Sequence, residues 1–297
     1  MAERVLIAGC GYVGSRLAEL LLDDGVRVWG LKRDPSTLPA GVGPVAGDVT
    51  RASTLDGLPS GDEAPDAVVY AVSPPGRTAE AYRTAYVDGL RNVLDAVDAG
   101  TASDDEGPPR PRLILVSSTG VYGQSDGQWV DEETPEEPAD AMAEAILEGE
   151  AVAVERGAPG TVIRLGGIYG PGRTWTVGRV LSGDAPCMGP ELYGNRVHRD
   201  DAAGAIRHLL TLTDPDPVYN GVDGEGAPLR EVYAWVAERA AVPDPCEGVD
   251  PEDARSEGRR GTNKRVSNDR LVSSGYDFIY PSFRDGYATL IPEASGG

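Results

Sequence analysis

The start of the chain alternates apolar and polar stretches in the order strand, turn, helix, strand. Val5 to Ala8 form a short apolar run, and two glycines follow closely. Leucines then recur at helical spacing until Gly25, after which Val26 to Leu31 form a second run that is apolar except for Arg27. A short apolar strand, a periodic helix and another apolar strand predict the opening of a parallel βαβ unit.

The alternation of strand and helix continues along the chain. Further strands are predicted at Val45, Ala67 to Val72, Leu113 to Ser117, Thr161 to Leu165 and Val218 to Asn220. Helices are predicted at Thr78 to Ala99, Asp140 to Arg156, Asp201 to Leu212 and Leu229 to Ala240. This order implies an α/β fold class, with a Rossmann-like, doubly wound parallel sheet.

The domain organisation follows from the polar segments between these elements. Gly100 to Pro111 and Val242 to Gly261 are rich in Pro, Gly, Asp and Glu, which is typical of exposed loops. Neither is long enough to separate independent domains. We therefore expect residues 1–297 to form one domain, in which the chain from about residue 165 onward builds a small C-terminal substrate lobe.

The charge balance excludes several classes of partner. The chain has 27 basic and 48 acidic residues, a net charge of −21, and only two lysines, Lys32 and Lys264. Such a surface repels nucleic acid and anionic membranes. Abundant carboxylates with almost no lysine also favour a halophilic protein over an acidic protein of an ordinary cytoplasm, because concentrated salt screens the repulsion.

Targeting and metal signals are absent from the sequence. No stretch approaches the roughly 18 apolar residues of a membrane-spanning helix, and the N-terminus lacks a signal-peptide layout, so we expect a soluble cytoplasmic protein. Cys10, Cys187 and Cys246 are widely spaced, without CxxC or nearby histidine pairs. This spacing predicts neither a disulfide framework nor a zinc site.

A glycine-rich turn follows the first strand and opens the first helix. Its sequence, GCGYVG, matches the GxGxxG pattern. In this setting the glycines permit a tight turn and close approach of the backbone, and the helix N-terminus attracts a pyrophosphate. We therefore predict a nicotinamide dinucleotide site. The residues assigned to it here are Gly9, Gly11, Tyr12, Val13 and Gly14.

The end of the second strand bears on which dinucleotide is preferred. An acidic residue there binds the adenosine ribose, whereas a basic residue accommodates a 2′-phosphate. Lys32 and Arg33 stand at this point, which favours NADP over NAD as the cofactor. Asp34 follows them and leaves NAD possible, since its carboxylate would suit a ribose hydroxyl.

Five further segments occur in a recognisable order. They are Gly47-Asp48-Val49, Ala71-Val72-Ser73, the run SSTGVYG from Ser117 to Gly123, the run RLGGIYGPGR from Arg164 to Arg173, and Val197 to Asp201. Together with the glycine turn, they resemble the short-chain dehydrogenase/reductase superfamily, in its extended or atypical branch of NAD-dependent epimerase/dehydratase-like proteins. The resemblance covers most of the chain, although Ala8 stands where the branch usually begins its glycine pattern.

The resemblance implies roles for several of these residues. Asp48 would meet the adenine amino group, and Val49, Ala71, Val72 and Ser117 would lie beside the cofactor. Ser118 would donate a hydrogen bond to the substrate oxygen, or else satisfy a backbone group at the strand end.

The superfamily's proton-transfer pair is missing from the sequence. The resemblance implies a Tyr with a Lys four residues later, but Val28 and Arg260 stand four residues before the two lysines. Counting back from Glu150 places Met142 and Ile146 at the two positions. Tyr122 and Tyr169 are then the nearest phenols expected in the cleft, and Tyr122 is our candidate proton donor beside Ser118.

Other chemically interesting residues have simpler interpretations. His198 suits proton transfer near neutral pH, but a structural histidine explains it better. Asp200 and Asp201 are expected to cap the helix that begins there. Trp129 and Trp175 line the pocket or pack in the core.

Two functions from different classes fit these observations. The first is an NAD(P)-dependent oxidoreductase or epimerase acting on a small carbonyl, hydroxyl or sugar-type substrate. The second is a regulator or redox sensor that binds NADP(H) without turnover, as the missing pair suggests. The resemblance further implies a homodimer, while nucleic acid, membrane and metal partners are not expected.

The halophilic interpretation predicts that stability depends on salt. Because the charge of −21 repels itself unless it is screened, the thermal unfolding midpoint should rise as KCl increases into the molar range. A midpoint that stays flat from low salt to molar salt would contradict this interpretation.

Overall fold

The computed structural model describes residues 2–101, 110–156, 160–250, 253–254 and 262–292. The two polar segments predicted as loops, Gly100 to Pro111 and Val242 to Gly261, lie partly outside these residues. Within them, contacts divide the chain into two compact units. The first unit comprises Met1–Val121, Asp140–Arg164 and Ala203–Tyr219, and the second comprises Tyr122–Ala139, Leu165–Ala202 and Asn220–Gly297.

A seven-stranded sheet with the order β10-β7-β5-β4-β1-β2-β3 forms the centre of the first unit. The four strand pairs from β3 to β5 are parallel. This order confirms the predicted Rossmann-like, doubly wound α/β class. The strands are β1 (Arg4–Ala8), β2 (Arg27–Lys32), β3 (Gly43–Ala46), β4 (Ala67–Tyr70), β5 (Arg112–Ser118), β7 (Gly160–Leu165) and β10 (Val218–Gly221).

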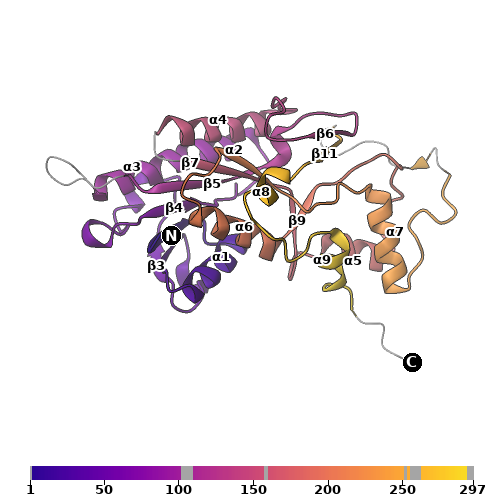
Figure 1. Cartoon of the computed structure of the whole chain (residues 1–297), viewed down its shortest axis with the longest axis horizontal. Coiled ribbons are helices and arrows are strands. Elements are labelled where there is room, and N and C mark those ends of the chain that lie inside the picture. The colour runs from indigo at the N-terminus through magenta and orange to yellow at the C-terminus, as the bar shows by residue number, and fades with distance from the viewer. Residues whose placement is uncertain (1, 102–109, 157–159, 251–252, 255–261, 293–297) are drawn as a thin grey trace. The chain divides into compact units, whose positions relative to one another are not determined.

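Helices cover both faces of this sheet. In Figure 1, α1 and α6 lie on one face and α2, α3 and α4 on the other. An ion pair between Arg207 and Asp24 joins α6 to α1. The helices are α1 (Tyr12–Asp23), α2 (Ala79–Arg83), α3 (Gly89–Thr101), α4 (Ala141–Glu155) and α6 (Arg199–Thr211).

The predicted helix from Thr78 to Ala99 contains one turn of π-helix, Thr84–Asp88, between α2 and α3. Tyr70 explains this irregularity, because its buried phenol donates a hydrogen bond to the Ala85 carbonyl. Gly89 leaves the room that the phenol needs, since a Cβ there would lie 2.6 Å from the Tyr70 oxygen. A wider turn thus accommodates an aromatic side chain from the sheet.

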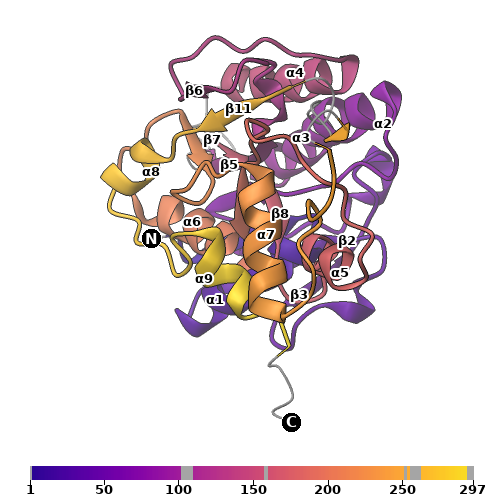
Figure 2. The same cartoon turned by 90° about the vertical axis from the view of Figure 1, so that its right-hand side faces the viewer.

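The second unit has its own hydrophobic core and is built from short elements. Its strands form two parallel pairs, β6 with β11 and β8 with β9. Figure 2 shows α7 beside α5 and α9, which pack around residues such as Val236, Phe283 and Tyr287. The elements are β6 (Gln128–Val130), β8 (Gly167–Tyr169), α5 (Trp175–Leu181), β9 (Arg196–His198), α7 (Leu229–Ala240), β11 (Lys264–Val266), α8 (Asp269–Ser273) and α9 (Phe283–Ala288).

A buried carboxylate, Asp201, organises the end of the chain in the second unit. The side chain is fully buried and accepts hydrogen bonds from the Tyr276 phenol at 2.9 Å and from the backbone N–H groups of Ile279 and Tyr280 at 2.7 and 2.9 Å. The prediction that Asp201 caps a helix is therefore wrong. Helix α6 already begins at Arg199, and Asp201 holds a distant segment instead.

Cys187 and Cys246 form a disulfide within the second unit, at a separation of 59 residues in sequence. The sequence predicted no disulfide framework, because neither spacing nor a nearby partner marked these two residues. A tertiary approach of two loops brings them together. Cys10, in the first unit, is buried and free.

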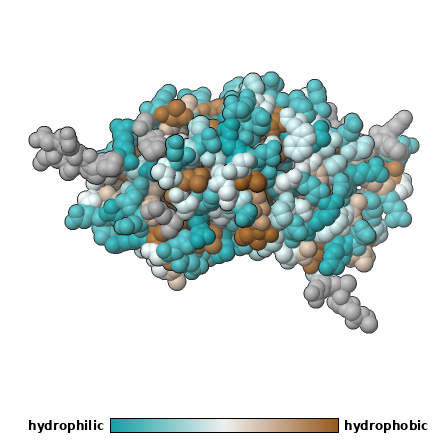
Figure 3. Space-filling view, in the orientation of Figure 1, coloured by the Kyte–Doolittle hydropathy of each residue, from teal (hydrophilic) through white to brown (hydrophobic). Residues whose placement is uncertain are grey.

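The surface and the helices carry two further features. On the face shown in Figure 3, hydrophilic residues predominate and hydrophobic ones form small scattered groups. None of the helices in the described ranges is long and apolar enough to cross a membrane.

Candidate functional site

The predicted cofactor residues follow neighbouring strands of the first unit. Gly9 follows β1, Lys32 ends β2, Asp48 follows β3 and Ala71 follows β4. These strands are parallel neighbours, so their carboxyl ends meet at one edge of the sheet. Ligands of open α/β sheets bind at that edge. The structure thus gathers residues from four separate segments of the sequence.

Two of the three glycines of the GxGxxG motif are required by the packing of the protein's own backbone. Gly9 has a φ of +88°, and a Cβ there would lie 2.6 Å from the carbonyl carbon of Ala71. At Gly14, a Cβ would lie 2.7 Å from the Gly9 carbonyl oxygen. These glycines let β4 and α1 pack closely against the turn after β1.

Gly11 has no such internal reason to be glycine. The nearest atom to a Cβ at this position is the Gly9 carbonyl oxygen, at an ordinary contact distance of 3.9 Å. Gly11 is the N-cap of α1, where no side chain provides a capping bond and no acidic residue occupies the first turn. The positive end of the helix is therefore open to an anion, and the missing side chain leaves room for one.

The end of β2 carries two basic side chains, and a hydrogen bond holds the first of them in place. Lys32 is half-buried, and its Nζ donates a hydrogen bond to the Thr37 hydroxyl at 2.5 Å, while Arg33 is exposed. Asp34, the acidic alternative, accepts a hydrogen bond from the Ser36 backbone N–H at 3.0 Å and so caps the short helix Pro35–Thr37. This hydrogen bonding to Ser36 lowers the pKa of Asp34.

The other residues predicted to bind the cofactor follow β3 and β4 at the same edge of the sheet. Asp48 accepts hydrogen bonds from Thr50, which lower its pKa, so the carboxylate is ionised and fixed in place. Val49 is buried, and its carbonyl accepts a bond from Asn92 of α3 at 2.8 Å. The carbonyl of Ala71 lies against Gly9, and Val72, the next residue, is half-buried.

The two serines at the end of β5 have different environments. Ser117 is buried, and its hydroxyl donates to Glu150 at 2.5 Å, which gives this side chain a partner inside the protein. Ser118 is half-buried, and its oxygen accepts a hydrogen bond from the Gly120 N–H at 3.1 Å. As an acceptor, the Ser118 hydroxyl keeps its own proton available for donation to a ligand.

Neither candidate phenol of the second unit is exposed. Tyr122 is fully buried, and its hydroxyl donates to the Asn220 side chain at 3.2 Å. Tyr169 is also buried, with its ring 4.3 Å from that of Tyr287 and its oxygen against Gly286. Burial raises the pKa of Tyr169 well above its ordinary value. Both environments favour packing over proton transfer.

His198 has the environment of a structural histidine. It is 2% exposed, its Nδ1 accepts a hydrogen bond from the Asp200 N–H at 3.2 Å, and its ring lies 4.1 Å from that of Tyr280. Burial lowers its pKa, so the imidazole is neutral near pH 7.

Two buried residues that sequence reasoning missed, Arg196 and Asp223, lie close together in the second unit, where the Asp223 N–H donates to the Arg196 carbonyl at 2.7 Å. Asp223 is 3% exposed, and burial raises its pKa to about 7, although Arg196 opposes the shift. Within the described residues, Asp223 Oδ2 and both terminal nitrogens of Arg196 lack a hydrogen-bond partner. No motif signalled this pair, because it depends on β9 lying beside the loop after β10.

Among the described residues, no group of three or more His, Cys, Asp or Glu side chains is arranged to hold a metal ion. Several carboxylates between Ser125 and Glu150 take part in turns and ion pairs. Glu148, for example, pairs with Arg83, and Asp140 caps α4 through the N–H groups of Met142 and Ala143.

Comparison with solved structures supports the fold at high coverage. A protein from Methylobacillus flagellatus, described as an NAD-dependent epimerase/dehydratase, is 34% identical with a TM-score of 0.78, covering 97% of both chains. At 22% and 21% identity, the Bordetella bronchiseptica enzyme WbmH with NAD+ and the human epimerase family protein SDR39U1 with NADPH share the fold. Their TM-scores are 0.73 and 0.72, over 96% of both chains for the first and 97% and 99% for the second.

Comparison with curated sequences and with protein families agrees with the comparison of structures. Protein YeeZ of Escherichia coli (strain K12) is 28% identical over 94% of this chain and 97% of its own. The 3-diazoavenalumate denitrifying reductase of a Streptomyces species is 26% identical, over 95% and 98%. The family described as the NAD dependent epimerase/dehydratase family matches residues 5–220. The chain therefore belongs to this family.

Proposed function

We propose that the protein is an NAD(P)-dependent oxidoreductase or epimerase/dehydratase-like enzyme that prefers NADP(H). Its substrate is a small molecule with a carbonyl or hydroxyl group, or a sugar-type molecule. The observation that carries the proposal is the room left beside Gly11 at the open N-terminus of α1, which the protein does not fill with its own atoms.

The residues of the first unit fit a dinucleotide. The turn from Gly9 to Gly14 would hold the pyrophosphate with backbone N–H groups, because a helix N-terminus attracts an anion. Asp48 is ionised and has the acceptor that an adenine amino group needs. When bound, the nicotinamide supplies a hydride acceptor or donor. The relatives that carry NAD+ or NADPH support this assignment of cofactor class.

The proposed preference for NADP(H) rests on the two basic residues at the end of β2, Lys32 and Arg33. A 2′-phosphate would meet Lys32, which already points its amine toward Thr37, and the exposed Arg33. Asp34 follows these two cations and caps the short helix Pro35–Thr37 through one carboxylate oxygen. Two cations at the end of β2 favour the phosphorylated ribose.

Ser118 is the group that we assign to the substrate. Its position at the end of β5 and its free proton suit a hydrogen bond to a carbonyl or hydroxyl oxygen. Met142 and Ile146 of α4 cannot exchange protons, and Ile146 is only 2% exposed. Of our two catalytic candidates, Ser118 is therefore better placed than the fully buried Tyr122.

A binding protein without turnover is the second candidate. The sequence lacks the Tyr and Lys pair, and Tyr122 and Tyr169 are both buried. A regulator or redox sensor needs the dinucleotide edge but no proton donor. The enzyme remains our preferred proposal, because losing a general acid costs about 10²–10⁴-fold in rate and leaves hydride chemistry possible.

The location, salt adaptation and partners of the protein stay predictions from the sequence. These are a cytoplasmic location, adaptation to high salt, a small-molecule substrate, a homodimer and no nucleic acid or membrane partner. The charge of −21 supports the exclusion of polyanions and the adaptation to salt.

Cofactor preference tests the assignment of Lys32. The wild type should bind NADP(H) several-fold more tightly than NAD(H), and Lys32→Asp should weaken NADP(H) binding by about tenfold or more, the value of a lost charge-assisted hydrogen bond. Titration calorimetry with both cofactors measures this. Arg27→Asp is the matched control, because it makes the same charge change at the opposite end of β2.

The preference should be unchanged in the Arg27 variant, whose ion pair with Glu63 is exposed and weak. Equal affinities of the wild type for the two cofactors, or an unaltered preference in Lys32→Asp, would remove the NADP assignment.

Turnover tests the role of Ser118. With carbonyl substrates and NADPH, or alcohols and NADP⁺, Ser118→Ala should lower kcat by roughly tenfold or more and leave the cofactor Kd unchanged, since only a transition-state contact is lost. Steady-state kinetics and cofactor titration separate these effects. Ser125→Ala, an exposed serine beyond the same strand, is the control and should behave as wild type.

A substrate panel that gives no turnover, while NADP(H) still binds, would favour the sensor instead. Turnover by Ser118→Ala at the wild-type rate would show that another group orients the substrate.

A further inference from the structure

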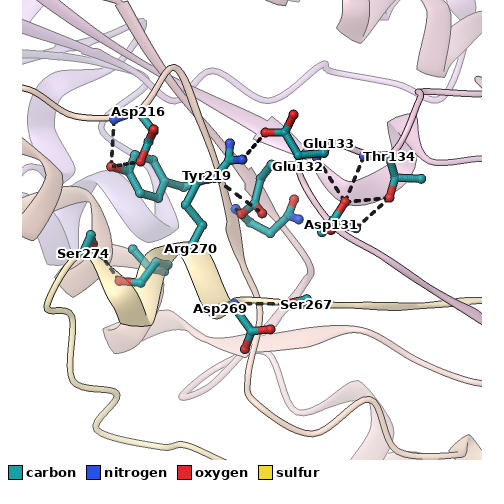
Figure 4. A network of polar contacts seen from close by, with 12 residues as sticks. Asp131, Glu132, Glu133, Thr134, Asp216, Tyr219, Ser267, Asp269, Arg270 and Ser274 are labelled. Atoms are coloured by element: carbon teal, nitrogen blue, oxygen red, sulfur yellow. Dashed lines mark hydrogen bonds and ion pairs between the residues drawn. The ribbon is translucent and has the colours of Figure 1, made fainter.

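A small cavity lies in the second unit where the parallel strands β6 and β11 end together. Val130 pairs with Val266 at this end, and polar residues follow both. The cavity has a volume of about 320 Å³, and its lining includes Trp129, Asp131, Gly224, Ser267 and Asp269. This volume lies within the range of small-ligand sites, about 300–1,000 Å³. Figure 4 shows Asp131, which follows β6, and Ser267 and Asp269, which follow β11, with Asp269 opening α8.

Trp129 gives the cavity a fixed aromatic wall. The side chain is 52% exposed, which is unusual for an indole. Arg265 holds it in place, with the guanidinium 5.2 Å from the centre of the indole and 4.6 Å from that of Tyr193. Arg265 Nε in turn donates to the Gly127 carbonyl at 2.7 Å. Arg265 thus supports one side of the Trp129 indole. The exposed part of the indole is therefore held in place before any ligand binds.

Two carboxylates line the same cavity. Asp131 Oδ1 accepts bonds from the backbone of Glu133 and from both the N–H and the hydroxyl of Thr134, as Figure 4 shows. These bonds keep the side chain fixed and lower its pKa, with Thr134 as the main cause. Asp269 is exposed, and its backbone N–H donates to the Ser267 hydroxyl at 3.0 Å.

The two neighbouring cations are engaged with other groups: Arg265 with the Gly127 carbonyl and the two rings, and Arg270 with a carboxylate. Arg270 follows Asp269 directly but pairs with Glu133 and lies 3.9 Å from the buried carboxylate of Glu132. Among the described residues that line the cavity there is no lysine or arginine. Its two carboxylates therefore carry negative charge that the cavity wall itself does not balance.

We propose that this cavity is a binding site for an organic ammonium group. An indole face and nearby carboxylates are the groups that attract such a cation, through the ring quadrupole and through charge. An anion is repelled by both carboxylates and by the net charge of −21. A neutral apolar ligand would cover the carboxylates without replacing their lost hydration. The site lies wholly in the second unit and does not depend on the proposed dinucleotide function.

The test uses tetramethylammonium as the probe and the whole protein. Saturation-transfer NMR on the probe's methyl signal, with KCl replaced so that ionic strength stays constant, measures binding without the screening effect of salt. The wild type should bind the probe saturably. Trp129→Ala should weaken binding at least about fivefold, in line with a partly desolvated cation–π contact.

Two more variants separate the cavity from other parts of the surface. Asp269→Asn should weaken binding about threefold, because an exposed charge is removed without touching a turn. Trp175→Ala is the matched control, since Trp175 is also exposed, at 65%, and carries Arg179 at 5.1 Å, but does not line the cavity. It should bind as the wild type does.

Three results would overturn the proposal. Unchanged binding in both Trp129→Ala and Asp269→Asn, with folding checked by circular dichroism, would place the probe elsewhere. Loss of binding in Trp175→Ala alone would do the same. Binding of methyl glucoside in place of tetramethylammonium, lost in Trp129→Ala, would assign the cavity to neutral hydroxyl-rich ligands.

Discussion

A buried ion pair between Glu150 of α4 and Arg164 of β7 fixes the first unit. The side chains are 9% and 2% exposed, Arg164 binds the carboxylate at 2.7 and 3.1 Å, and Ser117 of β5 donates to the same carboxylate. Removing one partner of such a pair typically costs about 3–5 kcal/mol, because the other charge stays buried. One helix and two strands are therefore held in a single register.

This register determines what α4 offers to chemistry. Ile146 lies one helical turn before Glu150 and is buried with it, and Met142 lies one turn earlier. The face on which the superfamily resemblance places a phenol and an amine thus carries apolar side chains. In the proposed function, the first unit keeps its dinucleotide edge while α4 provides packing, and the contact with the substrate is assigned to Ser118 at the end of β5.

The first unit was largely predictable from the sequence, and the second was not. Strands such as β1 and β2 each contain a short apolar run, and α1 has a regular apolar face, so local patterns determine them. By contrast, β6, β8, β9 and β11 have three residues each, too few to show a period. The Cys187–Cys246 bond, the role of Asp201 and the raised pKa of Asp223 depend on tertiary approach and burial. The glycine motif gave the site's place, but only the structure separated Gly11, which has open space, from Gly9 and Gly14, which do not.

The most direct test of the account is therefore Gly11→Ala, with Gly9→Ala as its control. A methyl at Gly11 meets nothing closer than 3.9 Å, so the unfolding free energy should fall by about 1 kcal/mol at most, through the weaker N-cap. Binding of both NADP(H) and NAD(H) should weaken by roughly tenfold or more, because the methyl would occupy the place proposed for the pyrophosphate. Gly9→Ala should instead destabilise the fold, since its methyl would lie 2.6 Å from Ala71. A stable Gly11→Ala protein that binds both cofactors like the wild type would contradict the dinucleotide site.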